Sequence, residues 1–333
     1  MKKLLLVVIT IAIHTCLQGQ DIKTYSNYDF VPGENILFED NFLSDQDGEF
    51  ASHWNLKSGQ AVVNKVADKT AFVLIAGNYA RVSPLIKVPN YLTDSFTVEF
   101  DFYVTSYAPV LFLKAKDKDN RAVNFGYRVN TSYFPNELSE NFPEGTDASF
   151  KKKWHHAALA YRSGQMKCYV DQYRVLVIPQ CGFVPQEIGL GGIASKDNPV
   201  VFTNVRIASG GNMNMLGKIL TDGKFITHAI TFDVNKADIK PESMGFLNSL
   251  VKFLKENSNV KLEIDGHTDS DGDEASNMKL SQQRADAVKA QLVLMGIDAS
   301  RLSSKGFGES KPIGDNTTPE AKANNRRVEF VKQ

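Results

Sequence analysis

The chain has 333 residues, a length that suggests about two domains. Its 42% hydrophobic and 23% charged residues are ordinary for a folded globular protein. Lys and Arg together number 38, as do Asp and Glu. No overall charge therefore favours nucleic acid or an anionic membrane surface, and no nucleic-acid partner is expected.

Residues 1–20 are predicted to be a secretory signal peptide. Lys2 and Lys3 precede an apolar run over 4–13, which is too short to cross a bilayer as a stable helix. Cys16 does not follow the small residues that precede a lipidated cysteine, so we expect it to leave with the signal. The mature protein is therefore expected to be exported. No later run is long and apolar enough to predict a transmembrane helix.

Residues 21–208 have the pattern of an all-β sandwich. The clearest strand is 96–104, in which Phe and Val alternate with polar residues, as expected for a sheet with one buried face. Further short β-rich runs are separated by Gly, Asn, Asp and Pro, and lie at 71–75, 109–113, 156–161, 167–170, 174–178 and 200–207. No helix of twelve residues is predicted here.

Two segments of this region carry a family resemblance. Trp154-His155-His156-Ala157-Ala158-Leu159 and Met166-Lys167-Cys168-Tyr169-Val170-Asp171 resemble paired strands of the concanavalin-A-like or laminin-G-like jelly roll. Residues 38–42 and 202–207 fit as first and last strands, while Gln172 stands where the family usually has Gly. The resemblance implies a jelly-roll module that binds a glycan or a protein, without identifying the ligand.

Two cysteines, Cys168 and Cys181, follow the signal, and export makes a disulfide chemically possible. A hairpin turning at Asp171-Gln172 would pair Cys168 with position 175 or 176. Cys181 would then lie about five residues farther on, roughly 16 Å at the strand rise. That exceeds the reach of a disulfide unless the chain folds back near Pro179, so the pairing stays open.

Residues 209–222 are predicted to be a linker, because Ser209-Gly210-Gly211-Asn212 cannot hold a regular element together. From residue 223 the pattern becomes β-α-β-α-β-β. We predict strands at 225–232, 260–264, 303–307 and 327–331, a helix opening at Pro241 and a helix over about 275–295. The first helix has a single apolar stripe, formed by Phe246, Leu247, Leu250, Val251 and Leu254.

Asp269 and Arg284 form the most informative pair in the chain. Asp269 stands at the end of a predicted buried strand, and Arg284 lies inside the following predicted helix. One fixed anion beside one fixed cation suits a ligand with an ammonium and a carboxylate on the same carbon. The pair therefore predicts recognition of a zwitterion and not catalysis.

Ordered blocks surround this pair: Phe232–Lys236, Ile239–Glu242, Gly266–Asp269, Asn277, Leu280-Ser281, Arg284-Ala285, Arg301–Ser303, Gly306–Glu309, Pro312-Ile313, Asp315-Asn316 and Asn325–Val328. Over about 220–333 these blocks resemble the OmpA-like peptidoglycan-binding domain, which also occurs in peptidoglycan-associated lipoproteins and flagellar stator proteins.

The resemblance implies that peptidoglycan is the partner. It also implies that the exported protein lies in the periplasm, associated with the outer membrane of a Gram-negative-type envelope. Asp269 would accept from the ammonium of a stem-peptide diaminopimelate, and Arg284 would pair with its carboxylate. Asn235, Asn277 and Arg326 also fall on family positions near the ligand. We expect Arg327 to be solvated and His267 to be a packed loop histidine.

The loop Asp271–Glu274 departs from the family by its acidity, and extra acid here would alter ligand preference. It begins like a calcium loop. However, Glu274 stands where the EF-hand needs Gly, and Leu280 where it needs Glu. No metal site and no cofactor are predicted.

Two alternatives to an anchored binding module remain open. Glu99-Phe100-Asp101-Phe102-Tyr103 resembles the catalytic strand of sandwich glycosidases, which would make the protein a wall-anchored hydrolase. Tyr103 replaces the carboxylate that would serve as the acid, so no enzyme is predicted. The other alternative makes 21–208 an outer-membrane barrel with a peptidoglycan anchor, but only 96–104 has the required strand length and alternation.

Overall fold

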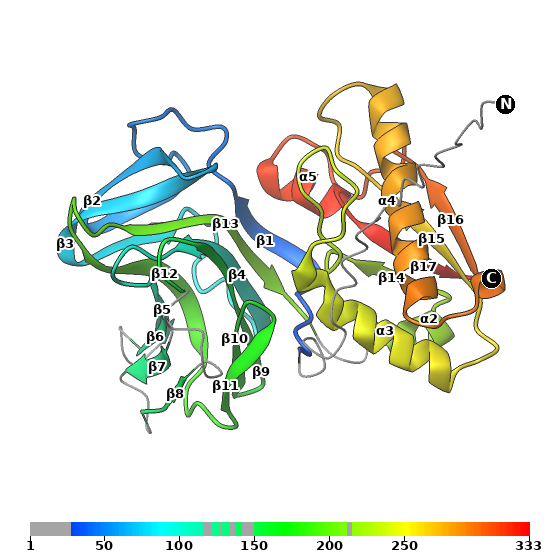
Figure 1. The fold of residues 1–333 in the computed structure, drawn as a ribbon, viewed down its shortest axis with the longest axis horizontal. Helices are drawn as coiled ribbons and strands as arrows, with labels where there is room; N and C mark the ends of the chain where they lie inside the picture. Colours follow the sequence, from blue (N-terminus) through cyan, green and yellow to red (C-terminus); the bar gives the residue numbers. More distant parts are fainter. Residues whose placement is uncertain (1–27, 116–120, 127, 133–136, 142–149, 212–214) are drawn as a thin grey trace, which may run out of the picture.

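The computed structural model describes residues 28–333 except 116–120, 127, 133–136, 142–149 and 212–214. The predicted signal peptide and Cys16 lie outside the described residues. A β-rich N-terminal domain lies beside an α/β C-terminal domain (Figure 1). No helix in the described part of the chain has both the length and the hydropathy needed to span a membrane.

The N-terminal domain contains thirteen described strands, all paired antiparallel. Their hydrogen-bonded order is β11-β10-β9-β4-β13-β3-β12-β5-β6-β7-β8, with β1 paired to β13 and β2 to β3. The strands are β1 (Asn35–Asp40), β2 (Trp54–Val66), β3 (Lys69–Pro84), β4 (Ser95–Tyr103), β5 (Val110–Ala115), β6 (Arg121–Phe125), β7 (Arg128–Ser132), β8 (Ser139–Asn141), β9 (Trp154–Arg162), β10 (Gln165–Val170), β11 (Tyr173–Ile178), β12 (Pro185–Ala194) and β13 (Val200–Ser209).

This sheet folds back on itself around one apolar core. The rings of Phe100 on β4 and Phe125 on β6 are 5.5 Å apart, although β13, β3, β12 and β5 lie between their strands. In a flat sheet they would be about 24 Å apart at the usual strand spacing. The predicted large antiparallel β region is therefore confirmed, and its assignment to the jelly roll stays a prediction.

The hairpin between β10 and β11 turns at the predicted place, and Cys168 pairs with Leu176 as expected. Asp171 and Gln172 both have positive φ angles, 46° and 66°, as a two-residue hairpin turn requires. Gln172 thus adopts a backbone conformation that Gly would take without strain. Cys168 and Cys181 are both free and buried, and burial raises the pKa of Cys181 to about 12.

The C-terminal domain has a four-stranded sheet in the order β14-β17-β15-β16, in which only β15 and β16 are parallel. Its elements are α2 (Met215–Thr221), β14 (Lys224–Thr227), η2 (Pro241–Ser243), α3 (Met244–Glu256), β15 (Leu262–Gly266), α4 (Glu274–Leu294), η3 (Ala299–Arg301), β16 (Leu302–Gly306), α5 (Pro319–Asn325) and β17 (Val328–Lys332).

The predicted order β-α-β-α-β-β omits the short helices α2 and α5. The first predicted strand, 225–232, is also too long, because β14 ends at Thr227 and Phe232 makes only an isolated bridge to Ile239. The predicted apolar stripe of α3 is confirmed, since all five of its residues are buried. They pack with the buried faces of α4 and the sheet, and each such side chain contributes about 1.5–3 kcal/mol.

Residues 28–34 bridge the two domains. Tyr28 and Phe30 pack against Tyr169 on β10, whereas Val31 belongs to the core of the C-terminal domain. A Cβ added to Gly245 on α3 would lie 2.3 Å from the carbonyl oxygen of Phe30. Only glycine therefore allows this close approach of α3 to the bridging segment.

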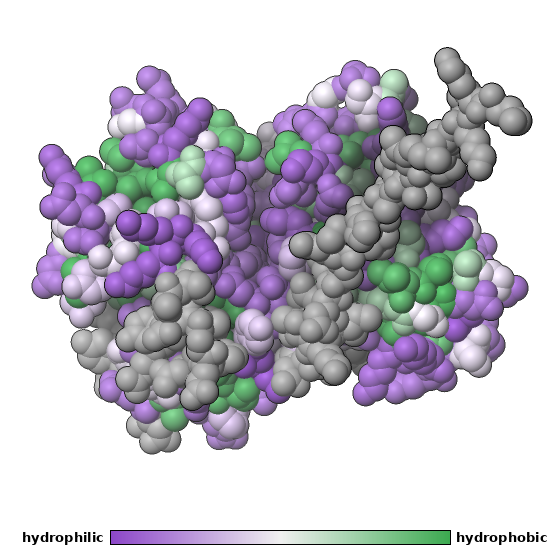
Figure 2. All heavy atoms as spheres, in the orientation of Figure 1, coloured by the Kyte–Doolittle hydropathy of each residue, from purple (hydrophilic) through white to green (hydrophobic). Residues whose placement is uncertain are grey.

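Further contacts join β1 to α5. The side chain of Asn324 accepts from the backbone N–H of Ile36 at 3.1 Å and donates to its carbonyl at 3.2 Å. Within the predicted linker 209–222, residues Met215–Thr221 form α2, and Ile219 is buried in the C-terminal core. On the face seen in Figure 2, hydrophilic residues line the seam between the two domains.

Candidate ligand-binding site

Asp269 is fixed in the loop that follows β15, which ends at Gly266. Gly266 lies so close to α4 that a Cβ there would be 2.3 Å from the carbonyl oxygen of Ser281. The backbone N–H of Thr268 then donates to the carbonyl of Gly308 at 3.0 Å. Asp269 is only 7% exposed; its Oδ1 accepts from the N–H of Asp271 at 3.1 Å, and its Oδ2 pairs with Arg326.

Arg284 projects from α4 and holds the loop that follows Phe232. Its Nε donates to the carbonyl of Lys236 at 3.0 Å and its Nη2 to that of Asp233 at 3.3 Å. The guanidinium also lies 4.9 Å from the centre of the Phe232 ring. Its Nη1 has no hydrogen-bond partner among the described residues, so one donor group remains for a ligand.

The charges of Asp269 and Arg326 both act on Arg284. Burial, together with the charge of Arg326, lowers the pKa of Arg284 to about 10, although the charge of Asp269 acts in the opposite direction. Burial would also lower the pKa of Arg326, but Glu39 and Asp269 raise it above its usual value. The fold therefore brings together an anion and two cations that are separate in the sequence.

Asn277 and Asn235, the remaining predicted site residues, differ in role. The Asn277 amide donates to the carbonyls of Asp269 and Asp271 at 3.3 and 3.1 Å, and to the Glu309 carboxylate at 2.6 Å. It therefore holds the loop that carries Asp269. Asn235 is exposed, with φ of 58°, in the loop that Arg284 holds.

The acidic loop is occupied mainly by contacts within the domain. Asp273 caps the N-terminus of α4 by accepting from the N–H of Ser276 at 2.9 Å. Asp271 pairs with Lys322 of α5 at 2.6 Å. These contacts leave Glu274 as the part of the loop whose charge has no such partner in the described chain.

Arg327 was expected in solvent, and this prediction is wrong. Arg327 is 5% exposed and donates to Glu329 at 2.7 Å and to the carbonyl of Lys311 at 2.9 Å. The missed signal is that residues 327 and 329 are two apart in the predicted strand 327–331, and so were expected on one face of it. His267 is packed, as expected, and stacks on Phe307 with ring centroids 5.2 Å apart.

Asp265, His267 and Glu329 meet beside a hollow of about 510 Å³ on the sheet, and their donor atoms lie within 4.8 Å of one another. Glu329 already pairs with Arg327 and Lys224, so a metal ion would lie beside a buried guanidinium. These neighbours oppose a cation, and we interpret the cluster as a structural ion-pair network.

The face of β4 that carries Glu99 and Asp101 is buried. Asp101 accepts from His156 and from Lys69, each at 2.9 Å. Burial would raise the pKa of Asp101, but these two groups, with Lys240 of the other domain, hold it well below its usual range. The strand that resembles a glycosidase motif thus faces a charge network at the domain seam.

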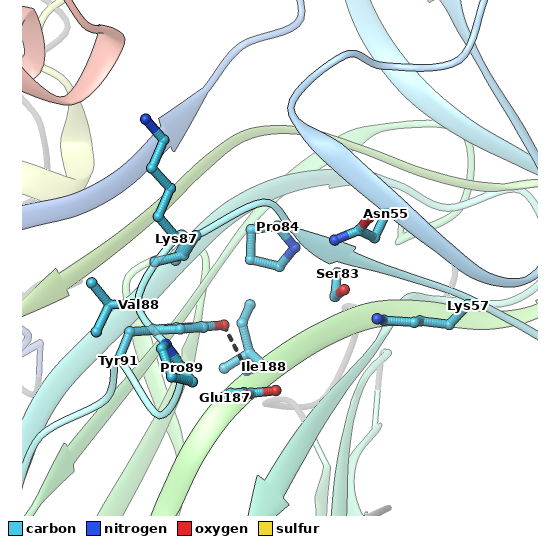
Figure 3. Close-up of a pocket in the computed structure, with 11 residues that line it drawn as sticks. Asn55, Lys57, Ser83, Pro84, Lys87, Val88, Pro89, Tyr91, Glu187 and Ile188 are labelled. Carbon is cyan, nitrogen blue, oxygen red and sulfur yellow. Dashed lines mark hydrogen bonds between the residues drawn. The ribbon is translucent and has the colours of Figure 1, made fainter.

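A second hollow, of about 220 Å³, lies at the edge of the N-terminal domain (Figure 3). Figure 3 shows Tyr91 and Glu187 on one side of it, with Asn55 and Lys57 on the other. The Tyr91 hydroxyl accepts from the N–H of Ile188 at 2.8 Å, which fixes the ring at the wall of the hollow. The lining mixes charged, amide and apolar groups.

Comparison with known proteins identifies the family of the C-terminal domain. The model of the OmpA family matches residues 231–326. These residues form an OmpA family domain. They include Asp269, Arg284 and Asn277, and end at Arg326.

Curated relatives agree over the OmpA family domain. Outer membrane porin F of Pseudomonas fluorescens is 46% identical over 100 residues, which cover 30% of this chain and 31% of the relative. Probable lipoprotein YiaD of Escherichia coli is 45% identical over 102 residues, covering 31% and 47%. The peptidoglycan-associated lipoprotein of Pseudomonas putida is 38% identical over 101 residues, covering 30% and 60%.

The chain thus spans less than half of the length of the first two of these relatives. Among solved structures, the peptidoglycan-associated lipoprotein of Burkholderia pseudomallei is 28% identical. It covers 31% of this chain and 88% of its own, with a TM-score of 0.30. The relatives are named as outer-membrane proteins or lipoproteins, which agrees with an envelope location for this protein.

Proposed function

We propose that the OmpA family domain binds the diaminopimelate-type stem peptide of peptidoglycan and anchors the N-terminal domain to the wall without catalysis. The observation that carries the proposal is the buried carboxylate of Asp269 paired with Arg326, whose charges both act on the guanidinium of Arg284. The name of the Pseudomonas putida relative supports the same ligand. The protein would act in the periplasm, at or near the outer membrane.

The ammonium and the carboxylate of the zwitterion would each bind a side chain that still has an unused hydrogen-bonding group. A carboxylate offers about four lone-pair sites, and Asp269 uses one oxygen for Asp271 and one for Arg326. A ligand ammonium can therefore still donate to Asp269. The ligand carboxylate would accept from Nη1 of Arg284. Because both groups are partly buried, these charge-assisted bonds are worth more than exposed ion pairs.

Retention on purified peptidoglycan tests this function. Wild type should cosediment with sacculi, whereas Asp269→Ala and Arg284→Ala should each remain in the supernatant. Lys279→Ala is a matched control, because Lys279 is exposed on the same helix. Circular dichroism must show all variants folded. Wild-type retention by both site variants would show that the site is assigned to the wrong residues.

We also propose that the N-terminal domain presents a glycan-binding hollow at Tyr91, Lys57 and Glu187. The support is the mixed polar and apolar lining of this hollow, which suits a saccharide. Soluble glycan fragments should bind wild type and lose affinity on Lys57→Ala or Glu187→Ala. Binding of a protein partner instead, unaffected by these changes, would place the ligand of this domain elsewhere.

A further inference from the structure

The ligand site reaches across the domain seam through Arg326. One terminal nitrogen of Arg326 pairs with Asp269, and the other pairs with Glu39 on β1 of the N-terminal domain. Glu39 in turn accepts from Nε and Nη2 of Arg206 on β13, at 2.8 and 2.6 Å. Asp269, Arg326, Glu39 and Arg206 therefore form a line of alternating charges that joins the two domains.

Glu39 is a firmly ionised member of this line. Burial would raise its pKa, but Arg206 and Arg326 outweigh burial and lower the pKa to about 2. The backbone around Arg326 is also held against the N-terminal domain. Asn324 bonds the backbone of Ile36, and its own carbonyl accepts from His228 at 2.9 Å. Arg326 is thus placed by both domains.

Arg326 divides its two terminal nitrogens between two carboxylates, and so does not form the bidentate pair that a guanidinium forms with a single carboxylate. Arginine pairs most strongly with a carboxylate when two of its N–H groups face the two oxygens. Here Asp269 receives one nitrogen only, because Glu39 takes the other. Asp269 therefore keeps lone pairs that a second cation can use.

We propose that Glu39 is a positioning residue of the peptidoglycan site, which holds Arg326 partly away from Asp269 so that the ligand ammonium can share that carboxylate. This inference rests on the proposed function. Without Glu39, Arg326 turns both nitrogens to Asp269 and competes with the ammonium. The N-terminal domain is then part of the binding site, and ligand binding and domain docking strengthen each other.

The test measures the dissociation constant of the full chain for a soluble diaminopimelate-containing muropeptide by calorimetry. Glu39→Gln, which keeps the shape and removes the charge, should weaken binding at least about fivefold, the low end for coupled sites. Glu49→Gln is the matched control, because Glu49 is an exposed acid of the same domain. It should bind like wild type.

Two further variants distinguish this role of Glu39 from a general weakening of the contacts between the two domains. In an Arg326→Ala background, Glu39→Gln should have no further effect, because the competing guanidinium is gone. Arg206→Met removes one partner of Glu39 but leaves its pairing with Arg326, so it should weaken binding less than Glu39→Gln does. The inference is overturned if Glu39→Gln binds like wild type or more tightly, or if its effect persists without Arg326.

Failure of the proposed function looks different from failure of this inference. If wild type does not bind the muropeptide, or if Asp269→Ala binds equally well, the assignment of the ligand site fails and Glu39 has no role in it. If wild type binds and Asp269→Ala does not, an unaffected Glu39→Gln variant overturns only the role of Glu39.

Discussion

Replacing Gly245 by Ala reports directly on whether α3 packs against the segment that bridges the domains. On a helix free of other contacts this change is stabilising, by about 0.8–1 kcal/mol, because Ala has the higher helix propensity. In the structure, however, the added Cβ would lie 2.3 Å from the carbonyl oxygen of Phe30. The sign of the effect therefore distinguishes a docked helix from a free one.

The magnitude follows from how little Phe30 can move. Real Cβ contacts are essentially never shorter than 3.0 Å, so backbone must shift. Phe30 is fully buried, with its ring centroid 5.3 Å from that of Tyr169. Overpacking of this kind costs about 1–3 kcal/mol, which exceeds the helix-propensity gain over most of that range. The cost less the gain is about 0–2 kcal/mol, so we expect Gly245→Ala to lower the free energy of unfolding by about 1 kcal/mol.

Urea unfolding of the full chain, followed by circular dichroism, measures this difference. Lys252→Ala is the control, because Lys252 is exposed on the same helix and should change stability by no more than about 0.5 kcal/mol. A Gly245→Ala protein that is as stable as wild type, or more stable, would refute the close packing of α3 on Phe30.

Two further predictions concern buried charge. Arg327→Met should lower the free energy of unfolding by about 3 kcal/mol, because it leaves the carboxylate of Glu329 buried with one cation fewer. Lys332→Ala is the control in the same measurement. An effect of Arg327→Met below about 0.5 kcal/mol would mean that Arg327 is solvated. Burial lowers the pKa of His228 to about 4, against about 6.5 in the unfolded chain. The unfolded state then binds more protons between these values, so stability should fall as the pH drops from 6.5 to 4, by up to about 3 kcal/mol. His228→Gln should make this fall shallower, as thermal unfolding at a series of pH values would show; an unchanged slope would contradict the assignment.

The sequence predicts well what depends on local periodicity. The apolar stripe of α3, the strand at 96–104 and the hairpin that pairs Cys168 with Leu176 all appear where the patterns place them. Asp269 follows a predicted strand and Arg284 lies in a predicted helix, both of which appear in the structure, and their pairing on a ligand stays a prediction. Short elements such as α5, which has seven residues, are too short to show a periodic pattern from which a helix could be predicted.

Contacts between segments that are far apart in the sequence could not be predicted from it. Arg326 and Glu39 are 287 positions apart, and no periodicity relates them. The same limit applies to Glu99, whose polar face of β4 looked solvated by alternation but is buried at the domain seam. Burial of Arg327 depends on its pairing with the buried carboxylate of Glu329, which the charge of either residue alone does not predict.

Comparison of two stem peptides tests the central claim, recognition of a zwitterion by Asp269 and Arg284, most directly. One peptide carries diaminopimelate, and the other carries lysine, which lacks the side-chain carboxylate. Loss of a charge-assisted hydrogen bond to Arg284 costs about 1.5–3 kcal/mol, so calorimetry should show the first peptide binding about 10–150-fold more tightly. Arg284→Met should remove most of this preference. Equal affinity of wild type for the two peptides would contradict the account.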